Sequence, residues 1–172
     1  VHEAIDIKSG SANLLATSLS IGEGVIKITK IIEKVKPDIF VIYADRYETF
    51  AAAIASSQTN TVTAHIEGGD ITEGGALDDS VRHAVTKLSN LHLVATERAK
   101  KIVKLMGENP KNVFNVGCPS IDVIKKINFK KKIDLSKYKY GVGHKLDLSQ
   151  PYIVILLHPV TTDYLRNLDL IN

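Results

Sequence analysis

The chain has 172 residues, of which 44% are hydrophobic and 24% are charged, and its formal net charge is +3. Such a composition can bury a sizeable core, which excludes a chain that is disordered throughout. No stretch approaches the roughly 20 consecutive apolar residues that cross a bilayer, and the first residues lack the pattern of a signal peptide, so we expect a cytoplasmic protein without a membrane partner. The single cysteine, Cys118, excludes an internal disulfide and a cysteine-based zinc site, and we interpret it as a small turn residue.

The first predicted elements are an amphipathic helix and a buried strand. Apolar residues recur at helical spacing up to Pro37, a residue that cannot continue a helix. The residues of this apolar face are Ile21, Val25, Ile28, Ile32 and Val35. The apolar run 39–43 then predicts a strand, and because no polar residue interrupts it we expect a central parallel strand that is covered on both faces.

Helices and strands alternate along the chain that follows. The predicted elements are helices at 47–57 and 78–88, strands at 61–66 and 91–95, a helix from the N-cap Thr96 to about residue 106, a strand at 113–116 and a further helix after residue 120. This alternation favours an α/β fold with a doubly wound, mostly parallel, Rossmann-like sheet and right-handed crossovers.

The predicted domain organisation has three parts. Residues 1–124 form an N-terminal Rossmann-like domain whose first strand is missing, 125–150 a linker, and 151–172 the start of a second Rossmann-like domain. The chain begins with Val and stops soon after a new strand pattern, so we expect a piece that is truncated at both ends. The lysines between Lys125 and Lys132 could contact nucleic acid, but no aromatic-basic interleaving accompanies them, and a solvated linker is favoured over a nucleic-acid partner.

Polar residues follow several of the predicted strands at the point where each strand ends. They are Asp45 with Arg46, Glu67 with Gly68 and Gly69, and His158. Open parallel sheets bind ligands outside the carboxyl ends of their strands, and glycines let backbone approach a ligand closely, so these residues are candidates for a binding site. Asp45 could instead simply end its strand, and His158 could be a turn residue, whereas a carboxylate placed like Glu67 has few structural roles.

The start of the helix at 78–88 contributes a second pair of charged residues. At about 100° per residue, Asp78 and Arg82 flank the apolar face of this helix, whereas Asp79 and His83 turn away from it. We therefore expect Asp78 and Arg82 to be neighbours on the rim of the core and Asp79 and His83 to face solvent. Asp78 could also serve only as a helix cap that pairs with Arg82.

The sequence lacks the common metal-site and nucleotide-cofactor motifs. His65 and Glu67 would point to the same side of a strand, but no HExxH or comparable ligand spacing is present, so we expect no metal. A GxGxxG fingerprint after a strand and a GxxxxGK[ST] loop are also missing, which disfavours nicotinamide and kinase-type ATP chemistry. We predict no cofactor, and we interpret His65 and His92 as structural.

Five segments resemble the hydrolysing UDP-N-acetylglucosamine 2-epimerases of sialic acid and related nonulosonic acid biosynthesis. They are KPDIFVIYADRYETFAAA, AHIEGGDITEGG, LDDSVRHAVTKLSNLHLVATE, NVGCPSID and LHPVTTD, in the family's order. The resemblance implies two Rossmann-like domains in a GT-B-type fold, with a UDP-sugar in the cleft between them, and a homo-oligomer, either a dimer or a tetramer. Ala44 stands where the family often has Gly.

The resemblance also implies roles for individual residues. It implies that Asp45, Glu67 and Asp78 are the catalytic carboxylates and that Arg82 supports them. His158 and Arg46 would contact the nucleotide sugar, His158 within the catalytic set as well, while Gly68 and Gly69 would lie against the substrate. Asp45-Arg46 and Asp78-Asp79-Ser80 favour the hydrolysing branch over the non-hydrolysing one.

The implied reaction converts UDP-N-acetylglucosamine and water to N-acetylmannosamine and UDP. UDP and the proton on sugar carbon 2 leave to form a glycal, which is then hydrated with the opposite configuration; the assignment of base and acid stays open. The rivals within the class are a non-hydrolysing epimerase and a hydrolysing enzyme for a GDP-sugar. A catalytically silent nucleotide-sugar-binding module is the alternative from another class.

Overall fold

The computed structural model describes residues 4–7, 14–72, 77–130 and 151–156, and the chain divides into two compact units, residues 1–123 and 124–172. All the described strands belong to the first unit. In the second unit, the described residues 126–130 and 151–156 are exposed and lie outside helices and strands. The predicted linker and second domain therefore stay predictions, and His158 lies outside the described residues.

The predicted first helix is confirmed and begins earlier than its apolar pattern. Helix α1 (Leu14–Val35) buries Ile28 and Ile32 at the centre of that pattern, and it ends where Lys36 adopts a φ of +48° before Pro37. It packs closely on α2 (Tyr47–Gln58), because a Cβ atom on Gly24 of α1 would lie only 2.8 Å from the Cβ atom of Ala51 in α2.

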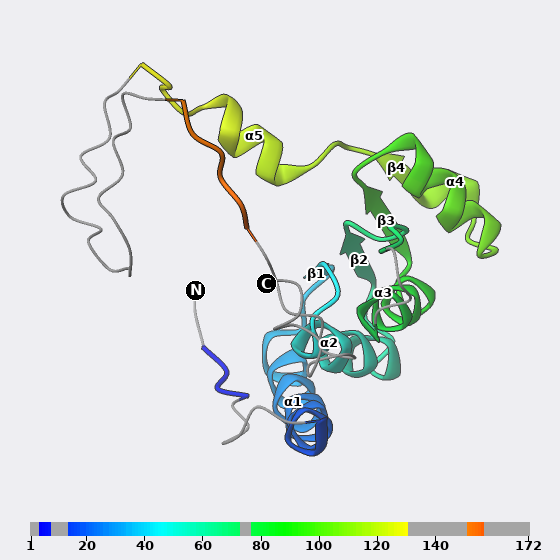
Figure 1. The fold of residues 1–172 in the computed structure, drawn as a ribbon. Helices are drawn as coiled ribbons and strands as arrows, with labels where there is room; N and C mark the ends of the chain where they lie inside the picture. Colours follow the sequence, from blue (N-terminus) through cyan, green and yellow to red (C-terminus); the bar gives the residue numbers. More distant parts are fainter. Residues whose placement is uncertain (1–3, 8–13, 73–76, 131–150, 157–172) are drawn as a thin grey trace. The chain divides into compact units, whose positions relative to one another are not determined.

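The sheet contains four described strands that are all parallel. Its strands β1 (Phe40–Tyr43), β2 (Thr63–Ile66), β3 (Leu91–Val94) and β4 (Val113–Asn115) follow one another across the sheet in chain order. Between them run α2, α3 (Leu77–Lys87) and α4 (Glu97–Leu105), with a short 3-10 helix, η1 (Pro110–Asn112), before β4 and α5 (Pro119–Lys125) after it (Figure 1). The predicted order of elements is confirmed, with end points that differ by one or two residues.

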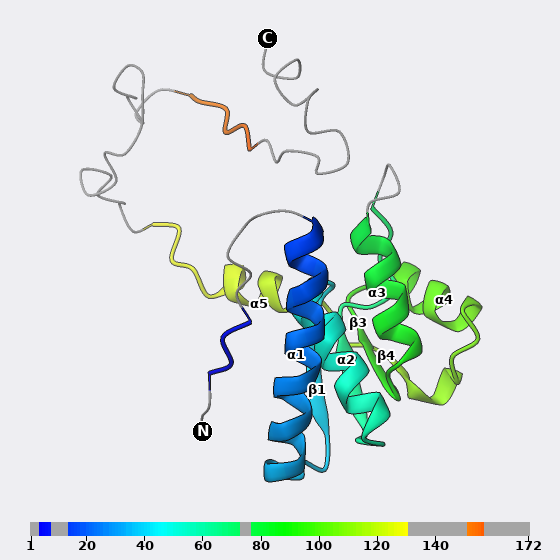
Figure 2. The same cartoon turned by 90° about the horizontal axis from the view of Figure 1, so that it is seen from below.

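One face of this sheet carries the helices. The register aligns Ile42, His65, His92 and Val113 across the strands, so their side chains share a face. Ile42 packs in a core with residues of α1 and α2, His65 contacts Thr86 of α3, and Val113 packs with residues of α4. Figure 2 accordingly shows α1, α2 and α3 in front of the strands. Right-handed crossovers that always step the same way across a sheet produce this arrangement.

The prediction that β1 is covered on both faces is wrong for the described residues. Ile42 is 5% exposed, but Val41 and Tyr43, which point to the other face, are 58% and 48% exposed. β1 is also the end strand of the described sheet. An uninterrupted apolar run identified the strand correctly, but such a run carries no information on which neighbours cover each face.

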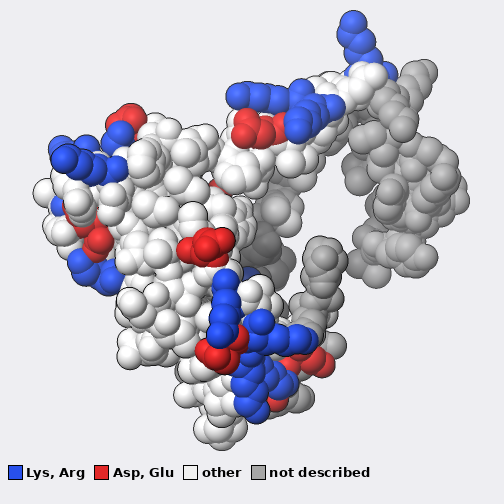
Figure 3. Space-filling model, turned by 180° about the vertical axis from the view of Figure 1, so that it is seen from behind, with Lys and Arg blue, Asp and Glu red and all other residues white. Residues whose placement is uncertain are grey.

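Charges and caps of the described helices follow simple local rules. Thr96 caps α4 as predicted, since its hydroxyl oxygen accepts a hydrogen bond from the Ala99 amide at 3.0 Å. Lysine and arginine side chains lie beside aspartate and glutamate on the face shown in Figure 3. Within α1, Lys27 and Glu23 form an ion pair with an Nζ to Oε1 distance of 2.6 Å. Among the described helices, none combines the length and apolar character that crossing a membrane requires.

Candidate active site

The chain turns sharply at the carboxyl ends of β1 and β2. Ala44 and Glu67, the residues directly after these strands, have φ values of +61° and +65°, which L-amino acids rarely adopt. Both turns are anchored to the neighbouring strand: the Ala44 amide donates to the Ile66 carbonyl at 3.0 Å and the Glu67 amide to the Leu93 carbonyl at 2.9 Å. The two turns therefore lie on adjacent strands, about 4.8 Å apart in the direction of the sheet hydrogen bonds.

Arg82 of α3 binds the carboxylate that follows β1. One guanidinium nitrogen, Nη2, donates to the Asp45 carboxylate, while Nη1 donates to Asp79 Oδ1 at 2.6 Å and to the Asp70 carbonyl at 2.8 Å. The side chain of Arg82 is 10% exposed and that of Asp45 is 23% exposed. Burial lowers the pKa of Arg82, but the hydrogen bonds and charges of Asp45 and Asp79 outweigh burial and leave that pKa raised, so Arg82 is a fixed cation.

The predicted orientation of Asp79 is wrong. Its side chain is 13% exposed, and besides the bond to Arg82 its two carboxylate oxygens both accept from the Thr72 amide at 3.0 Å. A helical wheel considers only the direction from the helix axis, whereas long helical side chains lean toward the helix N-terminus and here Arg82 covers the turn before it. The loop after β2 also folds back to Asp79, which the wheel does not include.

Asp78 and His83 are the other two residues of α3 whose exposure was predicted. Asp78 is exposed at the first turn of α3, where a ligand could reach its carboxylate. His83, which we expected to face solvent, is half-buried, and within the described residues its Nδ1 atom is buried without a hydrogen-bond partner. The predicted i, i+4 contact between Asp78 and Arg82 is replaced by the i, i+3 contact between Asp79 and Arg82.

Glu67 is held by side chains that the sequence analysis did not include in the site. The thiol of Cys118, which follows β4, donates to Glu67 Oε1 with an Sγ to oxygen distance of 3.1 Å. The hydroxyl of Tyr43 at the end of β1 also bonds Glu67, and this bond is the main reason why the pKa of Tyr43 is raised. Both residues stand at the carboxyl ends of strands, the signal by which they could have been selected.

His65 fixes the turn that carries Asp45. It is fully buried, and burial lowers its pKa to about 4, so the ring is neutral near pH 7. Nε2 lies 2.9 Å from the Ala44 carbonyl oxygen, which can only accept, so Nε2 carries the ring proton. Nδ1 lies 3.2 Å from the Thr86 hydroxyl oxygen, whose single proton is also within reach of the Arg82 carbonyl oxygen at 3.0 Å. The structural role predicted for His65 is confirmed.

The two glycines after Glu67 are required by packing. A Cβ atom on Gly68 would lie 2.9 Å from both His65 Nδ1 and Thr86 Oγ1, and one on Gly69 would lie 2.5 Å from the Ala99 carbonyl oxygen. Both glycines are buried. Their predicted contact with a substrate stays a prediction, since the close approach of this loop to α3 and α4 already explains both residues.

Arg46, the predicted cation after β1, has an exposed side chain. Arg46 precedes α2 with its side chain 71% exposed, paired with Glu48 at 2.9 Å and stacked over the Tyr47 ring with its guanidinium carbon 5.7 Å from the ring centre. Its pKa is raised, chiefly by the hydrogen bond to Glu48. Arg46 is thus a cation on the same edge of the sheet as Asp45, open to a ligand.

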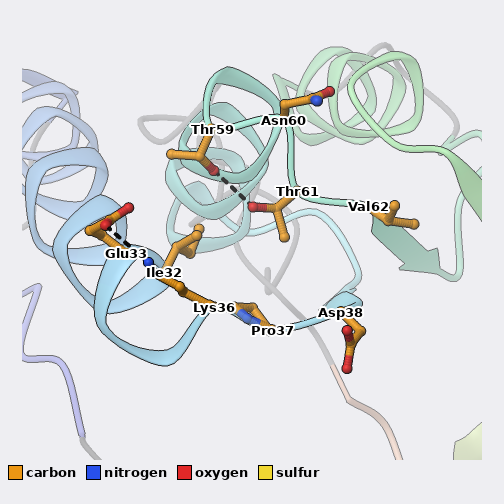
Figure 4. Close-up of a pocket in the computed structure, with 9 residues that line it drawn as sticks. All are labelled: Ile32, Glu33, Lys36, Pro37, Asp38, Thr59, Asn60, Thr61 and Val62. Atoms are coloured by element: carbon orange, nitrogen blue, oxygen red, sulfur yellow. Dashed lines mark hydrogen bonds and ion pairs between the residues drawn. The ribbon is translucent and has the colours of Figure 1, made fainter.

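A surface pocket at the other end of the sheet is separate from this site. It has a volume of about 300 Å³ and lies where β1 and β2 begin, between the ends of α1 and α2 (Figure 4). Residues on its wall include Lys36, Asp38 and Thr61. The described residues hold no group of three His, Cys, Asp or Glu side chains that could bind a metal ion, there or at the carboxylates.

Comparison with known proteins assigns the family. A family model described as UDP-N-acetylglucosamine 2-epimerase matches residues 2–169. The chain belongs to the UDP-N-acetylglucosamine 2-epimerase family. Similar members of this family include the hydrolysing UDP-N,N'-diacetylbacillosamine 2-epimerase of Legionella pneumophila, 32% identical over 92% of this chain and 40% of that protein. The hydrolysing GDP/UDP-N,N'-diacetylbacillosamine 2-epimerase of Campylobacter jejuni is 39% identical over 75% of this chain and 32% of that protein.

A solved structure of an epimerase shares the fold. The UDP-N-acetylglucosamine 2-epimerase of Methanocaldococcus jannaschii in complex with UDP-N-acetylglucosamine and UDP matches with a TM-score of 0.62 and 25% identity, over 73% of this chain and 35% of that one. The chain thus spans two fifths or less of the length of these three epimerases. The predicted fold class, a Rossmann-like parallel α/β sheet that is part of a GT-B-type fold, is confirmed.

Proposed function

We propose that this chain is part of a hydrolysing UDP-N-acetylglucosamine 2-epimerase, which converts UDP-N-acetylglucosamine and water to N-acetylmannosamine and UDP. The observation that carries the proposal is the pair of adjacent strand ends: Asp45, fixed by Arg82 at the end of β1, stands one strand away from Glu67 at the end of β2. Asp78 adds an exposed carboxylate at the start of α3. Carboxylates grouped at the carboxyl edge of a parallel sheet suit proton transfers on a sugar bound there.

The proposed reaction has two halves that balance without a redox partner. In the first, a base takes the proton from sugar carbon 2, and the bond between carbon 1 and the UDP oxygen breaks, which leaves a glycal with a double bond between these carbons. In the second, water adds its hydroxyl to carbon 1 while an acid delivers a proton to the opposite face of carbon 2. The two steps need one group that accepts a proton and one that donates it.

The proposed roles follow from charge and exposure. The candidates for proton transfer are Asp45, Glu67 and Asp78. The charged guanidinium group of Arg82 holds the Asp45 carboxylate in one orientation. Arg46 is exposed and would bind the diphosphate, whose negative charge grows as UDP departs. We also propose that His158, which lies outside the described residues, contacts the nucleotide sugar.

The hydrolysing reaction is favoured over a non-hydrolysing one by the named reactions of two similar proteins. Both the Legionella and the Campylobacter proteins are described as hydrolysing epimerases of UDP- or GDP/UDP-linked diacetylbacillosamine. They also define the substrates that compete with UDP-N-acetylglucosamine in our proposal. We propose the N-acetylglucosamine substrate because the motifs from residue 36 to residue 163 resemble those of the enzymes that act on it.

The test is product analysis with the full-length protein. Incubation with UDP-N-acetylglucosamine should release UDP and N-acetylmannosamine in equal amounts, and parallel incubations with the diacetylbacillosamine nucleotides should be slower. Release of UDP-N-acetylmannosamine would identify the non-hydrolysing reaction instead. Saturable UDP binding without any product would support the silent binding module.

A matched pair of variants connects the activity to the site. Glu67→Gln should lower turnover by about 100-fold or more while UDP still binds, because an amide cannot exchange the proton. Glu33→Gln makes the same chemical change on an α1 side chain that is 80% exposed and lies at the opposite end of the sheet, so turnover should not change. Equal turnover in the two variants would remove Glu67 from the mechanism.

A further inference from the structure

Glu67 receives hydrogen bonds from two segments that are distant in sequence. Cys118 donates its thiol to Oε1 from the turn after β4, and Tyr43 contributes its hydroxyl from the end of β1. The raised pKa of Tyr43 has the hydrogen bond to Glu67 as its largest cause. The carboxylate thus has a neighbour on the β1 side and another on the β4 side.

These contacts restrict a side chain that would otherwise be free to move. Glu67 is half-buried at a left-handed turn, and it has no described ion-pair partner comparable to the Arg82 that holds Asp45. Fixing a glutamate side chain costs roughly 1.5 to 2 kcal/mol of rotamer entropy. Hydrogen bonds donated to the carboxylate offset that entropy before any substrate binds, so the reactive oxygen is in place when the sugar arrives.

The surroundings of Cys118 fit a donor and do not fit a nucleophile. Reactive cysteines lie beside cations that stabilise the thiolate. Here the sulfur lies 3.1 Å from a carboxylate oxygen, and the S–H group donates to that oxygen. The thiol is therefore placed to orient Glu67.

We propose that Cys118 is a positioning residue for the Glu67 carboxylate, acting through its S–H hydrogen bond, with the Tyr43 hydroxyl as the second donor. The proposal rests on the proposed epimerase function for its kinetic consequence, but the contact itself can be tested without turnover. Cys118 does not exchange a proton with the sugar in this proposal.

The kinetic test uses full-length protein, three single variants and one double variant. Cys118→Ala removes the donor and should lower kcat for UDP-N-acetylglucosamine about tenfold, the factor that corresponds to one hydrogen bond to a charged group at the weak end of its range. The KM should stay within about twofold, because the thiol orients the carboxylate and does not bind the nucleotide. Cys118→Ser keeps a hydroxyl donor at the same atom position and should recover most of the lost kcat.

A third single variant, Tyr43→Phe, removes the second donor to Glu67. Tyr43→Phe should also lower kcat, and the combination with Cys118→Ala should lose more than either single change. If Cys118→Ala has the parent's kcat, or if Cys118→Ser is as slow as Cys118→Ala although both fold as the parent does, Cys118 has no positioning role.

An infrared measurement separates this inference from the proposed function. The S–H stretching band responds to hydrogen bonding, and the difference spectrum between the parent and Cys118→Ala isolates the Cys118 band. Glu67→Gln should shift that band because it replaces the charged acceptor, whereas the matched Glu33→Gln change should leave it in place. An unshifted band in Glu67→Gln would refute the contact. A shifted band in a protein without epimerase activity would instead refute the proposed function and keep the contact.

Discussion

Replacing Arg82 by methionine removes the one cation that three acceptors share at the carboxyl edge of the sheet. Its guanidinium bonds the carboxylates of Asp45 and Asp79 and the carbonyl oxygen of Asp70. Methionine retains much of the packing of the side chain against α3 and the sheet, so the change tests the charge and the hydrogen bonds more than the volume. The Arg82→Met variant leaves two carboxylates close together without their counter-ion.

The size of the effect follows from burial. Breaking a fully buried ion pair by removing one partner costs about 3 to 5 kcal/mol. The side chains of Asp45 and Asp79 are 23% and 13% exposed, so water reaches both carboxylates and screens them in part. We therefore expect a loss of about 2 to 3 kcal/mol for Arg82→Met, with about 1 kcal/mol for Arg82→Lys, which keeps the charge but cannot serve the three acceptors with one ammonium group.

Native-state hydrogen exchange at the amides of β2 and α3 is the suitable assay, because it reports local opening even if the full-length protein unfolds in more than one step. Arg98 of α4 is exposed, and Arg98→Met should change the opening free energy by less than about 0.5 kcal/mol. Equal protection of these amides in the Arg82→Met and Arg98→Met proteins would refute the predicted loss. A lower opening free energy in Arg82→Lys than in Arg82→Met would refute the role of the charge.

Two further predictions concern the scaffold around the site. Burial lowers the pKa of His65 to about 4 from an ordinary 6.5, so the unfolded chain binds the proton more readily than the folded chain. The stability that the neutral ring contributes is therefore fully present above pH 6.5. We expect the free energy of unfolding to fall by about 3 kcal/mol as the pH is lowered from 6.5 to 4. Urea titrations at several pH values should show this loss, and His65→Gln should flatten it. Gly69→Ala should destabilise the protein by about 3 kcal/mol, because the residue has a φ of +85° and the new Cβ atom would lie 2.5 Å from the Ala99 carbonyl oxygen. Gly22→Ala in α1, where nothing lies within 4 Å of the new atom, should stabilise the helix by about 0.5 to 1 kcal/mol, and equal effects of the two changes would contradict the steric argument.

The order of helices and strands could be predicted because it is written in local patterns. Apolar periodicity located α1 and the strands, Pro37 ended α1, and the Thr96 hydroxyl capped α4. Each of these depends on residues within a few positions of one another. The exposure of Val41 could not be predicted in the same way, because it depends on which elements pack on that face of the sheet.

Only those site residues that directly follow a strand could be predicted from the sequence. Asp45 and Glu67 were selected because parallel strands bring their carboxyl ends to one edge. The partner of Asp45 is 37 residues away and the thiol donor to Glu67 is 51 residues away, so neither contact leaves a trace in local spacing. The error over Asp79 has the same origin, since the Thr72 loop that binds it lies outside the helix whose periodicity was used.

The turn at Ala44 connects the scaffold to the chemistry that we propose. A left-handed alanine costs about 1 to 2 kcal/mol relative to an ordinary backbone conformation. The buried His65 ring donates to the Ala44 carbonyl and so opposes relaxation of the turn. Because Gly68 leaves the space in which the His65 ring and Thr86 meet, a side chain at Gly68 would displace His65, release Ala44 and move Asp45 away from Arg82. The orientation of the first carboxylate therefore depends on a buried histidine and a glycine that need not touch the substrate themselves.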